Sequence, residues 1–363
     1  MPQEHPATEI PAPKILSAVR ALPAYHRKTE DILPYVEQWL SDQPERFRKK
    51  VLRLYRNAQV DDRYSIMPPE EVFRETSFEE KNRRYAQAMT DLGEQALQRA
   101  LTAARLQPEQ LDYIITVSCT GIMIPSVDAY LINRLVLRED IIRLPVTEMG
   151  CAGGTAGLIY AQRLLRAHPG ARAAVLALES PTSTLQHQDF SMTNMVSTAI
   201  FGDGAACAIL GPDPGRLRPA IMGEGMYHFF DEPDMMGFQL RNTGLQMVLD
   251  VAVPDKIDSQ IDDILIPFLQ QQGSSLEEID HFLFHPGGRK IVQTVEERLQ
   301  PLGKDIDLTK QVLRQFGNMS SATILYVLAE CMEQQRAREG DQGLMLSFGP
   351  GFSAQRLFLK WQF

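Results

Sequence analysis

One stretch decides the fold: Glu148-Met149-Gly150-Cys151-Ala152-Gly153-Gly154-Thr155-Ala156-Gly157, in which a lone thiol stands among small residues. An apolar segment, residues 158–161, follows at once and predicts a helix. A thiol at the first turn of a helix faces unpaired backbone N–H groups and the positive end of the helix dipole, and both favour the thiolate. We therefore predict that Cys151 is a nucleophile held on a tight turn before a helix.

A second stretch repeats this pattern later in the chain: Phe316-Gly317-Asn318-Met319-Ser320-Ser321-Ala322-Thr323, which also leads into an apolar segment. Cys151 and Asn318 hold the same place in the two stretches, at an offset of 167 positions. Residues 111–121 and 279–288 form another such pair, in which Asp112 matches Asp280 at an offset of 168. The chain therefore reads as two copies of one unit. Chance similarity of two strand-loop-helix units is the alternative.

Two copies are too few for a solenoid, so we predict two α/β halves packed about a pseudo-twofold axis. Strands are expected in six apolar segments: 112–118, 172–179, 204–210, 281–284, 343–347 and 355–361. Residues 14–110 read as mostly helical, with Ser77 at the start of a helix that runs through Ala103. The turn-rich segment 211–215 is the expected boundary between halves at residues 1–215 and 216–363.

Composition limits the kinds of partner and location that the chain is expected to have. Its 363 residues are 44% hydrophobic, which is enough for a large core. The net charge of −9 argues against a nucleic-acid partner. No apolar run reaches the length of a membrane span, and residues 1–13 are polar and proline-rich, so we expect a cytoplasmic enzyme. No CxxC pair is present, so neither a disulfide framework nor a metal site is expected.

The predicted topology brings three reactive side chains, Cys151, His285 and Asn318, to one place, and two chemistries use such a set. In a papain-like hydrolase, the histidine activates the thiol and the asparagine orients the histidine. In a condensing enzyme, the thiol carries an acyl group while histidine and asparagine donate hydrogen bonds to a thioester oxygen. The duplication favours the second chemistry, because Asn318 stands where the other half has its nucleophile.

Four motifs, in this order, resemble the signatures of type III polyketide synthases, the chalcone synthase family: Met149-Gly150-Cys151-Ala152-Gly153-Gly154, His285-Pro286-Gly287-Gly288, Gly317-Asn318-Met319-Ser320-Ser321-Ala322 and Phe348-Gly349-Pro350-Gly351. The resemblance implies a thiolase-type αβαβα layered fold and a homodimer. It also implies an acyltransferase that uses coenzyme A thioesters, with no tightly bound cofactor. The implied reaction is iterative decarboxylative condensation of malonyl-CoA onto an acyl-CoA starter, followed by cyclisation.

The resemblance also assigns roles at the reacting centre. Cys151 matches the acyl-bearing nucleophile, held with His285 as a thiolate and imidazolium, and Asn318 joins His285 in an oxyanion hole. Phe201 matches one of the family's two gatekeeper phenylalanines, whereas the second gatekeeper position holds Met247. A flexible thioether in place of a rigid ring predicts that longer or bulkier chains are admitted.

Other matched positions surround the reacting centre. Six of them line the cavity or order its hydrogen bonds in relatives: Cys119, Thr120, Glu179, Thr184, Leu249 and Ser320. Ile124 matches a residue that reaches across the dimer into the partner's cavity. Some naphthol-forming bacterial members have cysteine where Cys119 stands, although a small buried apolar role is the alternative for this residue.

A basic helix is expected at residues 46–56, which is unusual in an acidic chain. A dock for the phosphates of the coenzyme explains it, and a solvated helix face is the alternative. Lys50 and Arg53 match phosphate-contacting positions of the family. The third such position is Asn57 here, and we expect Arg56 to replace it.

The substrate is predicted less directly. Met247 favours a fatty acyl starter and an alkylpyrone or alkylresorcinol product, whereas Cys119 favours a malonyl-primed aromatic synthase of the naphthol or phloroglucinol type. A ketoacyl-ACP synthase of the third class shares the cysteine, histidine and asparagine. It differs at Pro286-Gly287-Gly288 and Gly349-Pro350-Gly351, which favour the polyketide branch.

Overall fold

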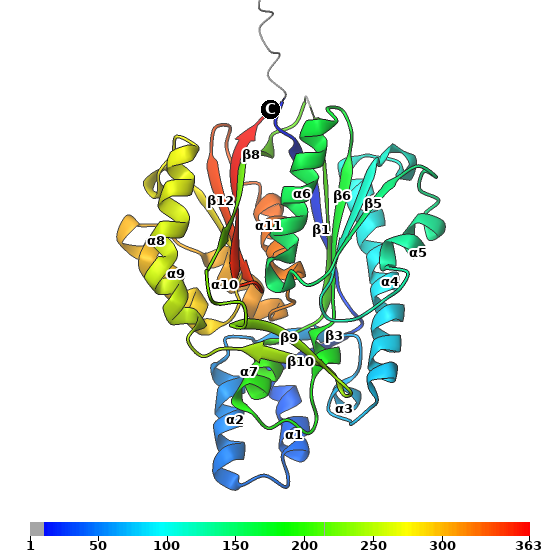
Figure 1. Ribbon diagram of the computed structural model, residues 1–363, viewed down its shortest axis with the longest axis vertical. Helices are drawn as coiled ribbons and strands as arrows, with labels where there is room; N and C mark the ends of the chain where they lie inside the picture. Colours follow the sequence, from blue (N-terminus) through cyan, green and yellow to red (C-terminus); the bar gives the residue numbers. More distant parts are fainter. Residues whose placement is uncertain (1–10, 214) are drawn as a thin grey trace, which may run out of the picture.

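Two helices, α6 (Gly153–Ala167) and α11 (Ala322–Gln334), form the central layer of the protein (Figure 1). The computed structural model describes residues 11–213 and 215–363, so most of the N-terminal segment considered above and Pro214 of the expected boundary turn lie outside the described residues. The main sheet has nine strands among the described residues, and its two halves lie on either side of this helix pair. Further helices cover the outer face of each half (Figure 1). The predicted five-layer thiolase-type arrangement is confirmed.

The N-terminal half contributes five strands to the sheet. β4 (Tyr113–Val117) pairs in parallel with β5 (Ile142–Val146) and with β6 (Ala173–Glu179). β7 (Gly204–Gly211) pairs antiparallel with β6 and also with β1 (Lys14–Ala21). Every residue of β6 and β7 is buried, as expected of strands that are covered on both faces.

The C-terminal half repeats this order. β11 (His281–Phe284) runs parallel to β12 (Gln342–Gly349), while β13 (Ser353–Gln362) is antiparallel to β12 and to β8 (Arg218–His228). The order β4-β6-β7-β1 thus recurs as β11-β12-β13-β8, with the same directions, and the predicted duplication is confirmed. The two halves join edge to edge where Lys14 of β1 pairs with Ala220 of β8.

The small residues of the Cys151 stretch are required by the contact between the two central helices. A Cβ on Gly154 would lie 2.3 Å from the backbone oxygen of Ser321, and one on Gly153 would lie 2.4 Å from Val117 Cγ1. Residues 322–329 of α11 are all buried, so this helix is apolar on every side. The glycines therefore let α6 approach both α11 and the sheet.

The segment 14–110 is mostly helical, as predicted, but the prediction missed its strands. It contains the central strand β1 as well as β2 (Tyr25–Lys28) and β3 (Asp62–Ser65), which pair with each other. The helices in this segment are α1 (Thr29–Trp39), α2 (Glu45–Asn57), α3 (Pro69–Val72) and α4 (Phe78–Ala104). Ser77 Oγ accepts from the Glu80 N–H at 3.2 Å and caps α4, as the sequence indicates.

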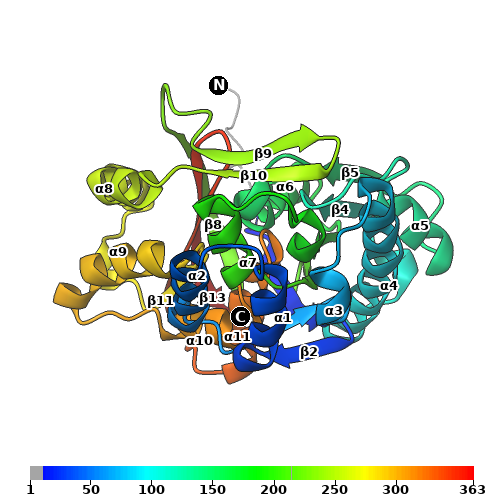
Figure 2. The same cartoon turned by 90° about the horizontal axis from the view of Figure 1, so that it is seen from below.

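One end of the layered core is covered by a smaller group of elements. It consists of α1, α2, α3, α7 (Met192–Ile200) and the hairpin of β9 (Met236–Arg241) and β10 (Gly244–Leu249), seen from below in Figure 2. The outer helices are α5 (Val127–Arg134), α8 (Val253–Gln271), α9 (Arg289–Leu299) and α10 (Asp307–Phe316). Within the described residues, no helix is long and apolar enough to cross a membrane.

Candidate active site

Cys151 lies in a single 3-10 turn, Gly150–Ala152, directly before α6. Gly150 has φ +50°, and a Cβ there would lie 2.4 Å from Pro350 Cδ, so this turn requires glycine. The Cys151 side chain is buried, and its Sγ–H donates to Ser320 Oγ at 3.7 Å. The turn therefore directs the thiol inward, toward the start of the equivalent helix in the other half.

His285 follows directly after β11, and its N–H donates to Leu346 O at 2.9 Å, which extends the pairing with β12. The residue is only 2% exposed. Neither ring nitrogen has a hydrogen-bond partner among the described residues. Burial lowers the pKa of His285 to about 3, so this imidazole is neutral in the unliganded protein and has an N–H free to donate.

The Asn318 amide is oriented by its own loop. Its Oδ1 accepts from the Ser320 N–H at 2.8 Å and from Thr323 Oγ1 at 3.4 Å. Its Nδ2 donates to Gly287 O at 3.2 Å. Because the acceptor side is occupied and only one N–H is used, the second N–H is available to a ligand.

One cavity brings these three residues together. Predicted gatekeepers and other apolar residues complete its wall; the lining residues are Cys151, Ile200, Phe201, Met236, Met247, Leu249, His285, Gly287, Ile291, Asn318 and Phe348. A thiol, an imidazole and an amide donor thus face one largely apolar space.

The expected thiolate–imidazolium pair is not formed in this arrangement. Burial raises the pKa of Cys151 to about 11, although the contact with Ser320 opposes this shift, and no hydrogen bond joins Cys151 to His285. The helix terminus favours the thiolate, but desolvation of the buried thiol is the larger effect here. Ionisation of Cys151 therefore requires a closer approach to His285 or to a bound ligand.

A second chamber adjoins the first on the side of Cys119. Cys151, Phe201 and Met247 line both chambers, and the second also includes Thr120 and Ser320. Cys119 Sγ lies 3.2 Å from Ser320 Oγ, the same hydroxyl that Cys151 contacts. Two thiols therefore converge on one serine beside the reacting centre.

Glu179 does not line this second chamber, but it forms hydrogen bonds with residues that do. Its buried carboxylate accepts from Thr120 Oγ1 at 2.6 Å, from the Cys119 N–H at 3.1 Å and from the Ser321 hydroxyl. Burial raises the pKa of Glu179, although these hydrogen bonds oppose the shift. Ser321 was not predicted as a site residue, and neither was Ser118, whose Oγ lies 3.3 Å from the same carboxylate.

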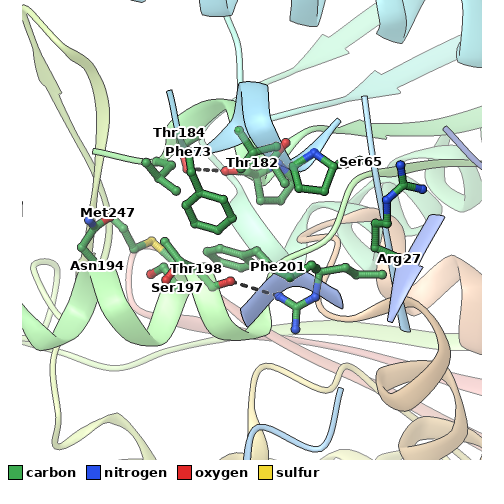
Figure 3. Close-up of a pocket in the computed structure, with 16 residues that line it drawn as sticks. Arg27, Ser65, Phe73, Thr182, Thr184, Asn194, Ser197, Thr198, Phe201 and Met247 are labelled. Atoms are coloured by element: carbon green, nitrogen blue, oxygen red, sulfur yellow. Dashed lines mark hydrogen bonds between the residues drawn. The ribbon is translucent and has the colours of Figure 1, made fainter. Parts of the chain in front are cut away.

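A third cavity lies on the far side of the predicted gatekeepers (Figure 3). Phe201 and Met247 line it as well as the catalytic cavity, and Thr184 is in its wall. Figure 3 shows Phe201 near its middle, with Met247 at one end and Arg27 at the other. The two gatekeeper positions therefore separate the catalytic cavity from this third cavity.

The basic helix predicted at residues 46–56 is α2. Its predicted docking residues Lys50 and Arg53 line a surface hollow together with Arg46, Lys49 and Glu45. Lys49 is paired with Glu45 at 2.6 Å. Arg56 lies outside this hollow and contacts Glu30 at 3.5 Å, so the structure separates it from Lys50 and Arg53.

Ile124 is the one predicted cavity residue that faces outward. Its side chain is 94% exposed and lines none of the cavities described above. No cluster of histidine, cysteine or acidic side chains suited to a metal ion occurs within the described residues.

Comparison with known proteins decides the family. The N-terminal domain of chalcone and stilbene synthases matches residues 10–214, and their C-terminal domain matches residues 227–361. The chain belongs to the chalcone and stilbene synthases. It is therefore a type III polyketide synthase, an acyltransferase, rather than the hydrolase or ketoacyl-ACP synthase that the sequence left open.

Relatives of this synthase include bacterial enzymes. A 1,3,6,8-tetrahydroxynaphthalene synthase of Streptomyces peucetius subsp. caesius is 32% identical, with 94% of this chain and 91% of the relative covered. A putative chalcone synthase of Bacillus subtilis is 29% identical, with 96% and 98% covered. The crystal structure of the tetrahydroxynaphthalene synthase of Streptomyces coelicolor A3(2) matches with a TM-score of 0.90 at 27% identity, covering 96% and 99%.

Proposed function

We propose that this synthase extends an acyl starter on Cys151 by decarboxylative condensation with malonyl-CoA. The observation that carries the proposal is the single cavity in which the Cys151 thiol, the unpartnered His285 ring and the oriented Asn318 amide meet. The wall of this cavity is largely apolar, so electrostatic contacts made inside it are strong.

The first step is the transfer of the starter acyl group to Cys151. Cys151 Sγ attacks the carbonyl carbon of the starter thioester as its thiol proton passes to His285. The bond between the acyl carbon and the coenzyme sulfur then breaks, and His285 returns the proton to the coenzyme, which leaves as its thiol. The pKa values of Cys151 and His285 in the unliganded protein oppose this proton transfer. Substrate binding therefore has to bring the two side chains together before the thiolate forms.

Extension of the chain depends on two hydrogen-bond donors, His285 and Asn318. The thioester oxygen of malonyl-CoA accepts hydrogen bonds from His285 and from the free N–H of Asn318. Loss of carbon dioxide then leaves an enolate on that oxygen, which both donors stabilise. The enolate carbon attacks the acyl thioester on Cys151, and the chain is transferred to the coenzyme two carbons longer.

The hollow on α2 is proposed to hold the phosphates of the coenzyme. Lys50 and Arg53 line it without an ion-pair partner among the described residues, whereas Lys49 and Arg56 are each paired with a glutamate. Unpaired cations on one helix face suit a phosphate group. No further cofactor is needed for this chemistry, and the cytoplasmic location stays a prediction.

For the starter, we propose a medium- or long-chain fatty acyl-CoA, which gives an alkylpyrone or alkylresorcinol after cyclisation. The third cavity supports this choice, because it lies beyond the gatekeepers and apolar side chains such as Ile32, Phe73 and Leu185 line it. Met247 is the flexible part of the barrier between the two spaces. A chain attached to Cys151 would enter the third cavity as this side chain changes rotamer.

Malonyl priming with an aromatic product is the second candidate. The contact of Cys119 and Cys151 with one serine favours it, because Cys119 places a polarisable thiol beside the growing chain. Relatives named tetrahydroxynaphthalene synthase and phloroglucinol synthase, at 32% and 27% identity, also support it.

A homodimer is proposed from the surface around Ile124. Further exposed apolar side chains gather on β5, on α5 and on the segments beside them: Ile122, Tyr130, Val136 and Ile142. β5 is also the edge strand of the sheet. An exposed edge strand with apolar neighbours suits contact with a second copy, and Ile124 would then reach the partner's cavity.

Mass spectrometry of the protein and its products tests the starter. After incubation with dodecanoyl-CoA, we expect the acyl mass on the peptide that contains Cys151, and pyrone or resorcinol products once malonyl-CoA is added. A series of starters of increasing length gives the longest chain accepted. Products that contain malonyl units alone, whatever starter is supplied, would overturn the fatty acyl proposal in favour of malonyl priming.

A further inference from the structure

Arg27 and Arg63 lie directly opposite each other in the two-stranded sheet of β2 and β3. Like charges at directly opposed positions of an antiparallel pair destabilise it. Both residues also line the third cavity, the space beyond Phe201 and Met247. The half-buried Arg27 and the buried Arg63 therefore concentrate positive charge at one wall of this space.

Arg63 is buried without a counter-charge among the described residues. It is 6% exposed, and its guanidinium donates to Thr198 O at 3.0 Å, Ala199 O at 2.9 Å and Thr29 Oγ1 at 3.0 Å. Its Nε has no partner in the described part of the chain. The ring of Tyr55, whose centroid is 5.5 Å from Arg63 Cζ, is a further neutral neighbour.

Arg27 has no acidic partner either. Its guanidinium donates to the neighbouring His26 O at 2.6 Å, and no ion pair forms at Arg27 or Arg63 within residues 11–213 and 215–363. Asp62, which precedes Arg63 in β3, instead contacts His26, with 2.8 Å between His26 Nε2 and Asp62 Oδ1. A buried guanidinium that meets only neutral groups is costly, and a second cation opposite it adds to that cost. An anion between the two would remove both penalties.

The other residues that line the third cavity indicate what kind of molecule the anionic group would belong to. Apolar side chains line it toward the gatekeepers, among them Ile32, Val72, Phe73 and Leu185. In Figure 3, Phe73 and Phe201 lie between Met247 and Arg27. The cavity is thus apolar at the end near the reacting centre and cationic at the other, which fits an aliphatic chain with a charged end.

We propose that this cavity binds the carboxylate end of an aliphatic chain, with Arg63 and Arg27 as the donors. A carboxylate matches a guanidinium because it accepts two parallel N–H bonds in one plane. Where the chain is the starter attached to Cys151, the inference rests on the proposed function and makes an ω-carboxyacyl thioester the preferred substrate. A free fatty acid shares the same chemistry and would occupy the same donors.

Binding of free dodecanoate, measured by calorimetry and by thermal unfolding, tests the site without catalysis. Dodecanoate is expected to raise the Tm of the wild-type protein, and its methyl ester is not. Arg27→Gln should weaken dodecanoate binding about tenfold. The same variant should raise the Tm of the ligand-free protein, because it removes the opposed charge. Lys28→Gln, which removes a charge from the same strand outside the cavity, is the matched control.

Kinetics with matched starters distinguish the two sources of the carboxylate. A tethered chain predicts that 11-carboxyundecanoyl-CoA is used with a kcat/KM about tenfold above that of dodecanoyl-CoA, and that Arg27→Gln abolishes this preference. Equal use of both starters, with dodecanoate binding intact, assigns the site to free acids.

No effect of Arg27→Gln on either measurement, or equal binding of dodecanoate and its ester, overturns the proposal. If the wild-type protein does not turn over malonyl-CoA, only the proposed function is contradicted. The dodecanoate binding measurement does not depend on turnover.

Discussion

Phe201 and Asn318 are joined by a parallel β-bridge between the two halves of the chain. The Asn318 N–H donates to Ile200 O at 2.8 Å, and the Gly202 N–H donates to Asn318 O at 3.1 Å. The bridge fixes a gatekeeper of one half to the amide donor of the other. Entry to the catalytic cavity and the orientation of its donor therefore depend on the same few backbone contacts.

Gly317→Ala is expected to disturb this bridge. Gly317 has φ +72°, and a Cβ there would lie 2.8 Å from Ile200 O, so both the conformation and the contact exclude a side chain. We expect a loss of about 1–3 kcal/mol in the free energy of unfolding, measured in urea, together with a marked drop in kcat. The comparison is with Gly303→Ala, at φ +67° but with nothing within 4 Å of the added Cβ, which should cost less and leave kcat unchanged. Equal effects of the two variants would show that the bridge is not involved.

The sequence predicted those elements that can be recognised from a short run of neighbouring residues. It did not predict elements that depend on contacts between distant parts of the chain. The strands at β4, β6, β7 and β11 to β13 were predicted because each is an apolar run bounded by turn residues. β1 was read as helical, since a short apolar run buried on both faces has no period that separates strand from helix. Its assignment comes from pairing with β7, almost 200 residues later.

The same distinction holds for the site. Cys151, His285 and Asn318 were found because each stands in a repeated or recognisable stretch, and the structure places them around one cavity. The opposed pair of Arg27 and Arg63 was missed, because it arises only when β2 meets β3. The protonation of Cys151 was also missed, since burial of the thiol is a property of the packed core.

The neutral state of buried His285 predicts a dependence of stability on pH. Its pKa is about 3 in the folded protein and 6.5 in an ordinary setting, so between these values the unfolded chain binds a proton that the folded protein does not. The free energy of unfolding should therefore fall as the pH is lowered below 6.5, by about 1.4 kcal/mol per pH unit from this residue. Urea unfolding between pH 4 and pH 8 should show this slope reduced in His285→Gln.

A replacement at the exposed His228 controls for the loss of an imidazole elsewhere. Identical pH dependence of the wild type and His285→Gln would mean that folding does not shift the pKa of His285. A loss of stability in the wild type as the pH rises above 6.5, absent in His285→Gln, would instead indicate a thiolate–imidazolium pair before substrate binds.

The basic residues of α2 should contribute unequally to binding of the coenzyme. Arg53→Gln is expected to raise the KM for malonyl-CoA severalfold with little change in kcat, because a phosphate contact far from the reacting atoms contributes equally to the ground and transition states. Arg56→Gln should have a smaller effect, since Arg56 lies outside the hollow and contacts Glu30. Steady-state kinetics of both variants decide this, and an equal rise in KM for Arg53→Gln and Arg56→Gln would contradict the assignment.

Met247→Phe should narrow the passage between the catalytic and third cavities. Met247 lines both spaces, and a rigid ring cannot change shape as the thioether does. We expect kcat/KM to fall about tenfold or more for dodecanoyl-CoA and little for acetyl-CoA, as measured with a series of starters. Leu249→Met, at a position that lines the catalytic cavity alone, serves as the control. An unchanged length profile in Met247→Phe would count against the gate.

The role of Asn318 as a donor to the malonyl thioester oxygen is the central claim, and release of labelled carbon dioxide from carboxyl-labelled malonyl-CoA tests it most directly. Asn318→Ala is expected to lower this release about 100-fold or more, while Cys151 of the same variant still takes up an acyl group from a starter thioester. That combination separates the oxyanion role of Asn318 from a general loss of structure. Wild-type rates of carbon dioxide release by Asn318→Ala would contradict the account.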